Sequence, residues 1–120
     1  MGARINFVFK ESDTRPAVVL YSHWGETEWQ RDLAMALQHS KPRWIDQTYA
    51  TRMMISYFMQ DCILEETGFG IYAVNDTEYD LGDSVVVIDF YNKTVYEAGS
   101  DVHVRWDAFI NAYAPQNISA

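Results

Sequence analysis

Short apolar runs typical of β-strands fall into two groups along the chain, and two helix-like segments lie between the groups. Alternating or unbroken apolar residues predict strands over residues 4–10, 17–21, 68–74, 84–91 and 94–98. Apolar residues at helical spacing predict helices over residues 26–39 and 47–66, and a last helix that Ser100 or Asp101 caps. The order β-β-α-α-β-β-β-α, with grouped strands and short loops, predicts an α+β fold in which a mostly antiparallel five-stranded sheet carries the helices on one face.

Local signals set the expected connections between these elements. The turn-forming stretch ESDTRP separates the first two strands, so we expect a hairpin with a loop of about six residues. Asp46 precedes the second helix and is a suitable N-cap for it. Asn92 and Lys93 predict a tight turn between the last two strands. Asp89 interrupts an apolar strand, so it must face solvent or have a polar partner.

The 120-residue chain carries a formal net charge of −8, and this charge limits the partners that it can bind. Its length suits one domain over residues 1–120, with residues 115–120 as a loose C-terminal tail. Binding to a nucleic-acid polymer requires a basic stripe, and the sequence has none, so we expect no such partner. No run approaches the ~20 apolar residues of a membrane span, so we expect no membrane partner either.

Cys62 is the only cysteine, and it lies within an apolar helical run. A disulfide within the chain is therefore excluded, and residues 1–10 lack the long apolar segment of a secretory signal, which together favour a cytoplasmic protein. The centre of the second helix, MMISYFMQDCIL, is apolar nearly all round. One sheet cannot cover so much apolar surface, so we expect a homodimer or a higher homo-oligomer.

The first candidate site is the corner that ends the second strand, in the sequence VVLYSHWGE. A strand end that leads into a helix exposes free N–H groups that can bind an anion, and Trp24 offers a flat surface beside them. Ser22 and His23 are neighbours on a strand and point to opposite faces, which makes them poor partners for nucleophilic catalysis; the G-x-S-x-G pattern is also absent. A packed tryptophan and a histidine bonded to the backbone would explain the same residues without a ligand.

The second candidate site runs from Arg43 and Trp44 into the long helix. Arg43 and Arg52 can bind a phosphate or a carboxylate through their guanidinium groups, while Trp44 and Tyr49 can stack on a base or another ring. Two simpler explanations stay open. The polar residues of this helix can form a stripe that faces water, and Arg43 can form an ion pair with Asp46.

Metal binding is only weakly indicated. Acidic residues recur between positions 76 and 83, as in calcium-binding loops, but the glycine and glutamate that an EF-hand requires are missing, and a solvated acidic loop explains them better. The acidic residues are Asp76, Glu78, Asp80 and Asp83. The three histidines show no zinc-like spacing, so we expect no metal and no cofactor.

At VVLYSHWG, PRWID and YATRM the chain resembles a small family, without an assigned activity, of proteins encoded by tailed phages and prophages. The resemblance spans most of the chain and implies a short α+β protein that opens with a hairpin and carries LYSHWG before a helix. It brings no catalytic residues to this sequence. Small acidic phage proteins often counter host defence by sequestering nucleotide signals or by occupying a binding surface of a host protein, so the resemblance implies one of these roles.

These features favour a non-enzymatic protein that binds and sequesters a small anionic, nucleotide-derived ligand in the host cytoplasm. We expect the corner at residues 22–25 and the segment at residues 43–52 to face one concave surface. The predicted ligand-binding residues are Ser22, His23, Trp24, Arg43, Trp44, Tyr49 and Arg52. Two alternatives stay open: an acidic inhibitor of a host defence protein or nucleic-acid-binding protein, and a small hydrolase that uses His23.

Overall fold

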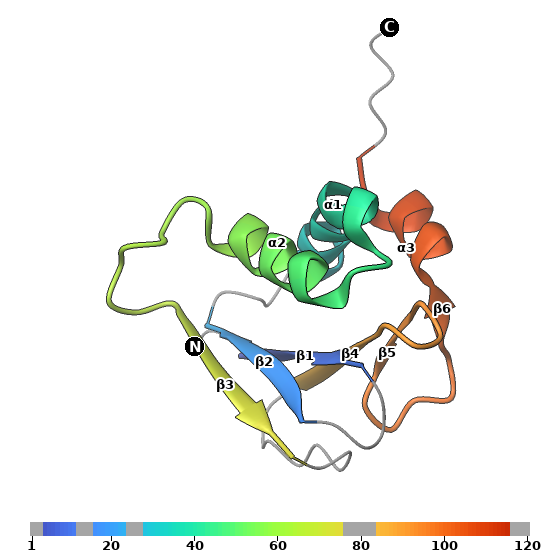
Figure 1. Cartoon of the computed structure of the whole chain (residues 1–120), viewed down its shortest axis with the longest axis horizontal. Coiled ribbons are helices and arrows are strands. Elements are labelled where there is room, and N and C mark those ends of the chain that lie inside the picture. Colours follow the sequence, from blue (N-terminus) through green and yellow to red (C-terminus); the bar gives the residue numbers. More distant parts are fainter. Residues whose placement is uncertain (1–3, 12–15, 24–27, 76–83, 116–120) are drawn as a thin grey trace, which may run out of the picture.

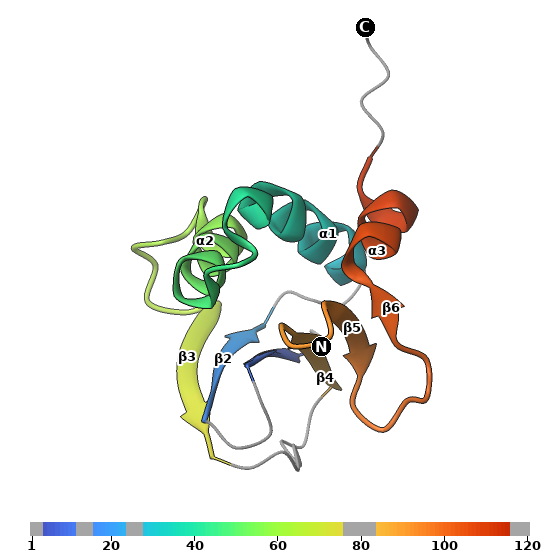
Figure 2. The same ribbon diagram turned by 45° about the vertical axis from the view of Figure 1, so that its right-hand side comes forward.

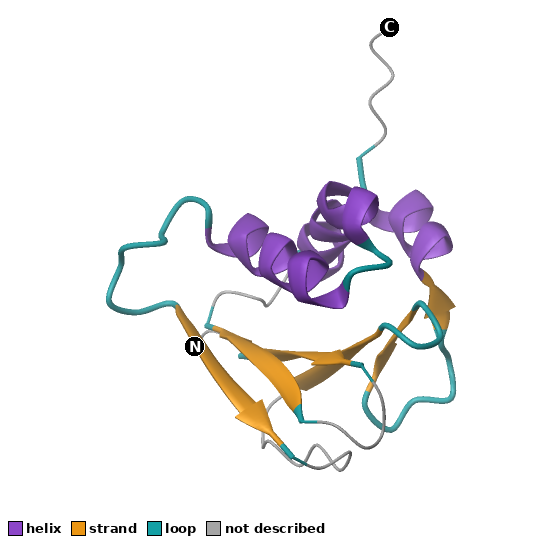
Figure 3. Cartoon of the chain, in the orientation of Figure 1, coloured by secondary structure: helices purple, strands orange, loops and turns teal. Residues whose placement is uncertain are grey.

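The computed structural model describes residues 4–11, 16–23, 28–75 and 84–115, which form a sheet covered by helices on one face (Figure 1). The described strands are β1 (Ile5–Lys10), β2 (Ala17–Ser22), β3 (Phe69–Val74), β4 (Ser84–Asp89), β5 (Thr94–Glu97) and β6 (Val104–Arg105). The described helices are α1 (Trp29–Ser40), α2 (Gln47–Met59) and α3 (Trp106–Tyr113), with a short 3-10 helix, η1 (Lys41–Arg43), between α1 and α2. Figure 3 shows the helices in one layer above the strands. The predicted α+β class, with the helices on one face of the sheet, is confirmed.

Over the described residues the sheet has six strands in the order β3-β2-β1-β4-β5-β6, whereas the sequence predicted five. Most of its pairings are antiparallel, as expected, and β1 and β2 form the predicted hairpin. The pairing of β1 with β4 is parallel, with Ile5 opposite Ser84, so the sheet is mixed. The residues of β4 are buried from Val85 to Asp89. A strand that is buried on both faces belongs in the centre of a sheet, and the open edge of β1 provides that position.

The sheet is apolar on both faces. Phe7 of β1 belongs to the main core beneath the helices, whereas its neighbour Val8 joins Val87 in a second buried cluster on the opposite face. On that opposite face the Tyr72 hydroxyl donates a hydrogen bond to Oδ1 of Asn6 over 2.8 Å. This bond satisfies the amide oxygen of a residue that is only 2% exposed.

Helix α2 begins where the sequence predicts but ends earlier. Asp46 is the predicted N-cap, and its carboxylate accepts a hydrogen bond from the Tyr49 N–H over 3.5 Å. The apolar pattern predicts a helix over residues 47–66, yet α2 ends at Met59, and the Cys62 N–H donates to the Met59 carbonyl over 2.9 Å in a tighter turn. None of the described helices has the length and apolar character needed to cross a membrane.

The last helix begins later than predicted, so the proposed caps are wrong. Ser100 instead closes a local turn, because its hydroxyl accepts a hydrogen bond from the Val102 N–H over 3.0 Å. The chain then pairs with β5 as β6, and α3 starts at Trp106, whose N–H donates to the Lys93 carbonyl over 2.9 Å. Figure 2 shows α3 rising directly from β6, at the side of the sheet opposite to β3.

The predicted tight turn after β4 is confirmed. Lys93 has a φ of 56°, the left-handed conformation typical of such turns. Asp89 has a polar partner, because its carboxylate accepts hydrogen bonds from the backbone N–H of Asn92 over 3.1 Å and from its side-chain amide over 3.0 Å. The acidic residue in this apolar strand is therefore buried and hydrogen-bonded within its own turn.

Trp106 connects α3 to the sheet and to the chain between α1 and α2. Its ring lies edge-on to Trp44 and to Phe90, with centroid distances of 4.9 and 5.0 Å. Its Nε1 donates a hydrogen bond to the Thr94 carbonyl over 3.0 Å, and the Lys93 ammonium lies 5.6 Å from the ring centroid. The side chain is 1% exposed, so all of this contact is internal.

Candidate ligand-binding site

A cavity of about 300 Å³ lies where the C-terminal end of α2 meets α1 and the strands β1, β2 and β3. The described residues that line it are Phe7, Ser22, Trp29, Asp32, Tyr57, Phe58, Gln60, Asp61 and Phe69. The chain leaves α2 and returns as β3 (Figure 1), so Asp61 and Phe69 border the cavity from the two ends of this connection. Its volume is at the lower end of the range of cavities that hold small ligands.

Aromatic rings form the walls of the cavity and are held in place by one another. The Phe7 and Phe58 rings lie 4.7 Å apart, and the Trp29 ring lies 6.4 Å from Phe7. On its other side Trp29 stacks against Phe109 of α3, with a centroid distance of 6.3 Å. Contacts in this range are favourable aromatic pairs, so the rings of the walls stabilise one another through their own packing.

The polar residues of the cavity divide into a buried one and an exposed rim. Ser22 is 4% exposed and lies at the end of β2. Asp32, Gln60 and Asp61 are exposed residues that border the cavity. Gln60 is fixed by its side-chain amide, which donates to the Tyr57 carbonyl over 2.9 Å and so satisfies the C-terminal end of α2. The rim therefore presents two carboxylates.

The electrostatic character of the described lining is acidic. Partial burial raises the pKa of the Asp32 carboxyl above its usual range, the charge of Glu28 raises it further, and the Arg31 guanidinium lowers it. Arg31 is itself paired with Glu28, with 3.0 Å between the charged atoms. The last turn of α2 adds the partial negative charge of a helix C-terminus. No lysine, arginine or histidine is among the lining residues that the structure describes.

The corner predicted from VVLYSHWGE contributes one residue to this cavity. Ser22, at the end of β2, lines it. His23 is half-buried, and its backbone N–H donates to the Gly68 carbonyl over 2.9 Å, which extends the pairing of β2 with β3. Trp24 and the three residues after it lie outside the described residues, and α1 is described from Trp29 onward.

The predicted cationic residues lie away from the cavity lining. The Arg43 guanidinium lies 5.3 Å from the centroid of the Tyr49 ring, and both residues are exposed. Arg52, also exposed, donates a hydrogen bond to the Ser56 hydroxyl over 3.2 Å. These arginines belong to η1 and to the first half of α2, whereas the cavity lies at the last turn of α2. Within the described chain, the structure therefore does not bring the 43–52 segment together with Ser22.

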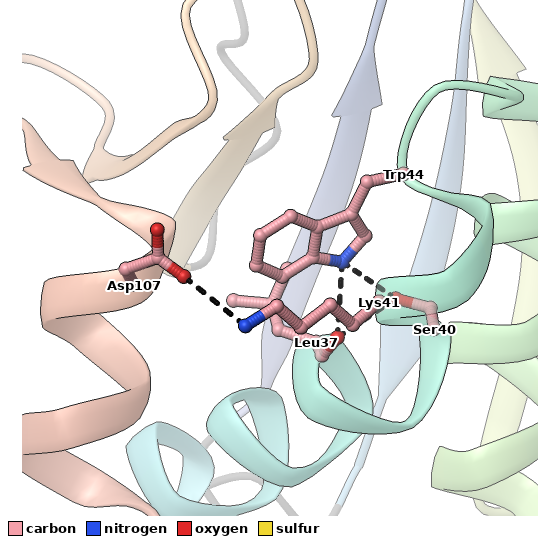
Figure 4. A network of polar contacts seen from close by, with 5 residues as sticks. All are labelled: Leu37, Ser40, Lys41, Trp44 and Asp107. Atoms are coloured by element: carbon pink, nitrogen blue, oxygen red, sulfur yellow. Dashed lines mark hydrogen bonds and ion pairs between the residues drawn. The ribbon is translucent and has the colours of Figure 1, made fainter.

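Trp44, another predicted ligand-binding residue, has an internal role (Figure 4). Its Nε1 donates to the Leu37 carbonyl over 3.0 Å and to the Ser40 hydroxyl over 3.2 Å. Beside it the Lys41 ammonium and the Asp107 carboxylate form an exposed ion pair over 3.8 Å. The indole thus closes the C-terminal end of α1, and its only N–H is already engaged there.

The acidic segment with a pattern similar to calcium-binding loops falls in a part of the chain that the structure does not describe. Its residues, Asp76, Glu78, Asp80 and Asp83, lie outside the described residues. Over residues 4–11, 16–23, 28–75 and 84–115, no group of three or more histidine, cysteine or acidic side chains is arranged to hold a metal ion.

Most of the cavity residues were not predicted from the sequence. Gln60 and Asp61 carried a usable signal, because they are the polar interruption in the apolar run MMISYFMQDCIL. Asp32 carried another, since it lies three residues after Trp29 and next to the buried Leu33 on α1. Neither signal indicates that Asp32 and Asp61 line the same cavity. Their positions there require α2 to end at Met59, which the sequence does not predict.

Comparison of the chain with protein-family models, with curated proteins and with solved structures finds no match. The function is therefore inferred from the residues of the cavity. Its aromatic walls and its acidic rim are the two properties on which that inference rests.

Proposed function

We propose that this protein binds a small ligand that carries an ammonium or guanidinium group, in the cavity at the end of α2. The observation that carries this proposal is the presence of two carboxylates, Asp32 and Asp61, beside the aromatic walls of Phe7, Trp29 and Phe58. Carboxylates attract a cation, and aromatic rings bind it on their faces at centroid distances within about 6 Å. A phosphate or carboxylate ligand would meet like charge at the same rim.

The shape of the cavity supports a ligand with a cationic end and an apolar body. The carboxylates border the exposed side, so the charged group of the ligand would lie there, and its apolar part would extend inward along the rings of Trp29 and Phe58. Ser22, which is 4% exposed, gives the cavity wall one buried polar residue.

The anionic, nucleotide-derived ligand predicted from the sequence stays a prediction, and its charge suits this cavity less well. Its phosphates would need Arg43 or Arg52, which lie outside the described cavity lining. Arg43 packs on an exposed tyrosine and Arg52 bonds to a half-buried helical serine, and both arginine side chains are accessible from solvent. One measurement distinguishes the two kinds of ligand.

Thermal melting in the presence of ligand panels tests the sign of the ligand charge. The cationic panel contains agmatine, arginine amide, spermidine and choline, and the anionic panel contains AMP, GMP and a cyclic dinucleotide. We expect at least one cation to raise the melting temperature by several degrees, because a ligand at 100 times its Kd stabilises the folded state by about 2.7 kcal/mol. Sodium chloride at matched ionic strength is the control, since cations in general stabilise a chain with a net charge of −8. Stabilisation by the anionic panel alone would contradict the proposal and support the sequence prediction.

Cation binding should weaken as the pH falls, starting above the range in which an ordinary aspartate titrates. The pKa of Asp32 is raised by partial burial, and only its carboxylate form attracts the cation, so lowering the pH through this raised pKa removes one of the two partners. Titration calorimetry between about pH 4 and pH 7 measures this effect. Asp32→Asn should bind more weakly at neutral pH and lose the upper part of the pH dependence. Identical pH profiles for the variant and the unmodified protein would show that Asp32 does not contact the ligand.

A further inference from the structure

The strand β3 is an open edge of the sheet in the described part of the chain. It is the outermost strand beside β2, and Figures 1 and 2 show no described element beyond it. The other outer strand, β6, has two residues against six in β3. Edge strands are commonly protected by lysine, proline or short length, and β3 has none of these protections. Ile71 is 58% exposed on it, so the edge is both apolar and accessible.

The register with β2 shows which backbone groups of β3 point outward. His23 and Gly68 continue this register, and the bond from the His23 N–H to the Gly68 carbonyl marks a hydrogen-bonded pair. Hydrogen-bonded and non-hydrogen-bonded pairs alternate along an antiparallel ladder. The even-numbered residues of β3 therefore direct their N–H and C=O groups toward β2. Phe69, Ile71 and Ala73 direct theirs away from the sheet, toward an unoccupied edge of the described chain.

We propose that β3 pairs with β3 of a second copy of this chain, in the antiparallel register that places Ile71 opposite Ile71. A two-fold axis then passes between the two isoleucines, and Phe69 of each copy lies opposite Ala73 of the other. All three outward-pointing residues of each strand meet outward-pointing residues of the partner. A shift of one residue would instead set outward groups against inward ones. Each matched pair forms two backbone hydrogen bonds. The seam, which is the line where the two β3 strands meet, therefore contains about six such bonds.

The side chains of β3 suit pairing with a second copy. The strand carries no charge, so antiparallel pairing with itself sets no like charges opposite each other. On the helix side of the sheet, Ile71 meets its own copy and the large Phe69 lies opposite the small Ala73. On the other side, the Tyr72 hydroxyl bonds to Asn6, which holds this ring over the sheet and away from the seam. Self-complementarity of this kind is what a two-fold interface requires.

The size and charge of the two chains predict a weak dimer that salt strengthens. A six-residue strand pair buries less than the roughly 1,200–2,000 Å² of a stable complex. Each chain also has a net charge of −8, so two copies repel each other at low salt. Added salt screens this repulsion and should raise the dimer fraction. If β3 instead paired with a basic partner, added salt would screen an attraction and would lower the fraction of complex. The dimer does not depend on any ligand in the cavity.

Cysteine cross-linking tests the register directly. In a Cys62→Ser background, which removes the native thiol, Ile71→Cys places two cysteines opposite each other. Opposed residues of a hydrogen-bonded pair have Cα atoms about 5.5 Å apart, within the range that a disulfide spans. We expect mild oxidation to give a covalent dimer with Ile71→Cys and not with Ala73→Cys, whose opposite residue is Phe69. Equal cross-linking of both variants, or none with Ile71→Cys, would overturn the proposal.

The second test measures the dimer fraction by sedimentation of the chain that carries none of these cysteine substitutions. The dimer fraction should rise with protein concentration and with salt, and Ile71→Lys should abolish it because two ammonium groups would oppose each other at the axis. Ile45→Lys is the matched control, since Ile45 is 96% exposed and lies between η1 and α2. Thermal melting of both variants shows whether they fold. A monomer at all concentrations and salts, or a dimer that survives Ile71→Lys, would overturn the proposal.

Discussion

Replacing Trp106 with alanine should lower the free energy of unfolding by about 4 kcal/mol, within the range of about 3–5 kcal/mol found for buried aromatic side chains. The substitution removes a side chain that is 1% exposed and packs edge-on against Trp44 and Phe90. It also leaves the buried carbonyl of Thr94 without the hydrogen bond that it now accepts from the indole N–H. Since small domains are stable by only about 5–15 kcal/mol, this one change should remove a large share of the total.

Urea unfolding followed by circular dichroism measures the effect of the Trp106 substitutions. Trp106→Phe keeps a ring and loses the hydrogen bond to Thr94, so its loss should be smaller, about 1–3 kcal/mol. Tyr91→Ala is the control, because Tyr91 is 81% exposed and its truncation should change stability by no more than about 0.5 kcal/mol. A loss below about 1 kcal/mol for Trp106→Ala would show that the aromatic cluster contributes little to the core.

The double variant Asp32→Asn with Asp61→Asn should weaken cation binding by about 100-fold or more. A hydrogen bond to a charged group contributes about 1.5–3 kcal/mol, so each single variant should weaken binding by about 10-fold or more. Asparagine has nearly the size of aspartate, so the cavity keeps its shape while its rim becomes neutral. The two effects need not add fully, because the remaining carboxylate of each single variant can still attract the ligand.

Titration calorimetry measures how much each of the two carboxylates contributes to binding. The ligand is the cation that gives the largest melting shift. Asp107→Asn is the matched control, because it changes the net charge by the same amount as either single variant and lies outside the cavity lining. Its ion pair with Lys41 is exposed and 3.8 Å long, so its loss should cost little stability. If Asp107→Asn weakened binding as much as Asp32→Asn, the attraction would be due to overall charge. If the double variant bound normally, the ligand would occupy another site.

Residue periodicity predicted most of the elements because most of them bury one face or both. The predicted five-stranded sheet was wrong where the pairing of strands depends on which strand edge is free in the folded chain. The parallel pairing of β1 with β4 is a long-range choice that no local pattern contains. The strand β6 has only two residues, Val104 and Arg105, which is too short to show alternation. The early end of α2 was missed because the apolar run continues to Ile63 and Leu64, which are exposed at 61% and 93%.

The candidate site was harder to predict than the fold. The strand end visible in the sequence predicts Ser22 as a site residue, which stays a prediction, and the structure places Ser22 in the cavity lining. The guanidinium chemistry of Arg43 and Arg52 predicts an anion site, but the position of each on its helix decides what it contacts. Asp32 and Asp61 come from α1 and from the turn after α2, and they approach the same cavity only through the packing of these two helices. Such a meeting follows from tertiary structure alone.

The central position of β1 has a consequence for how the chain is made. During synthesis β1 and β2 leave the ribosome before β4 and can pair with each other, but the second edge of β1 stays open until residues 84–89 have also emerged. Until then a nascent chain exposes Val8, which is fully buried in the finished sheet, next to an unpaired strand edge. Within the described sheet, the second edge of β1 is thus closed by a strand that is made much later than β1 itself.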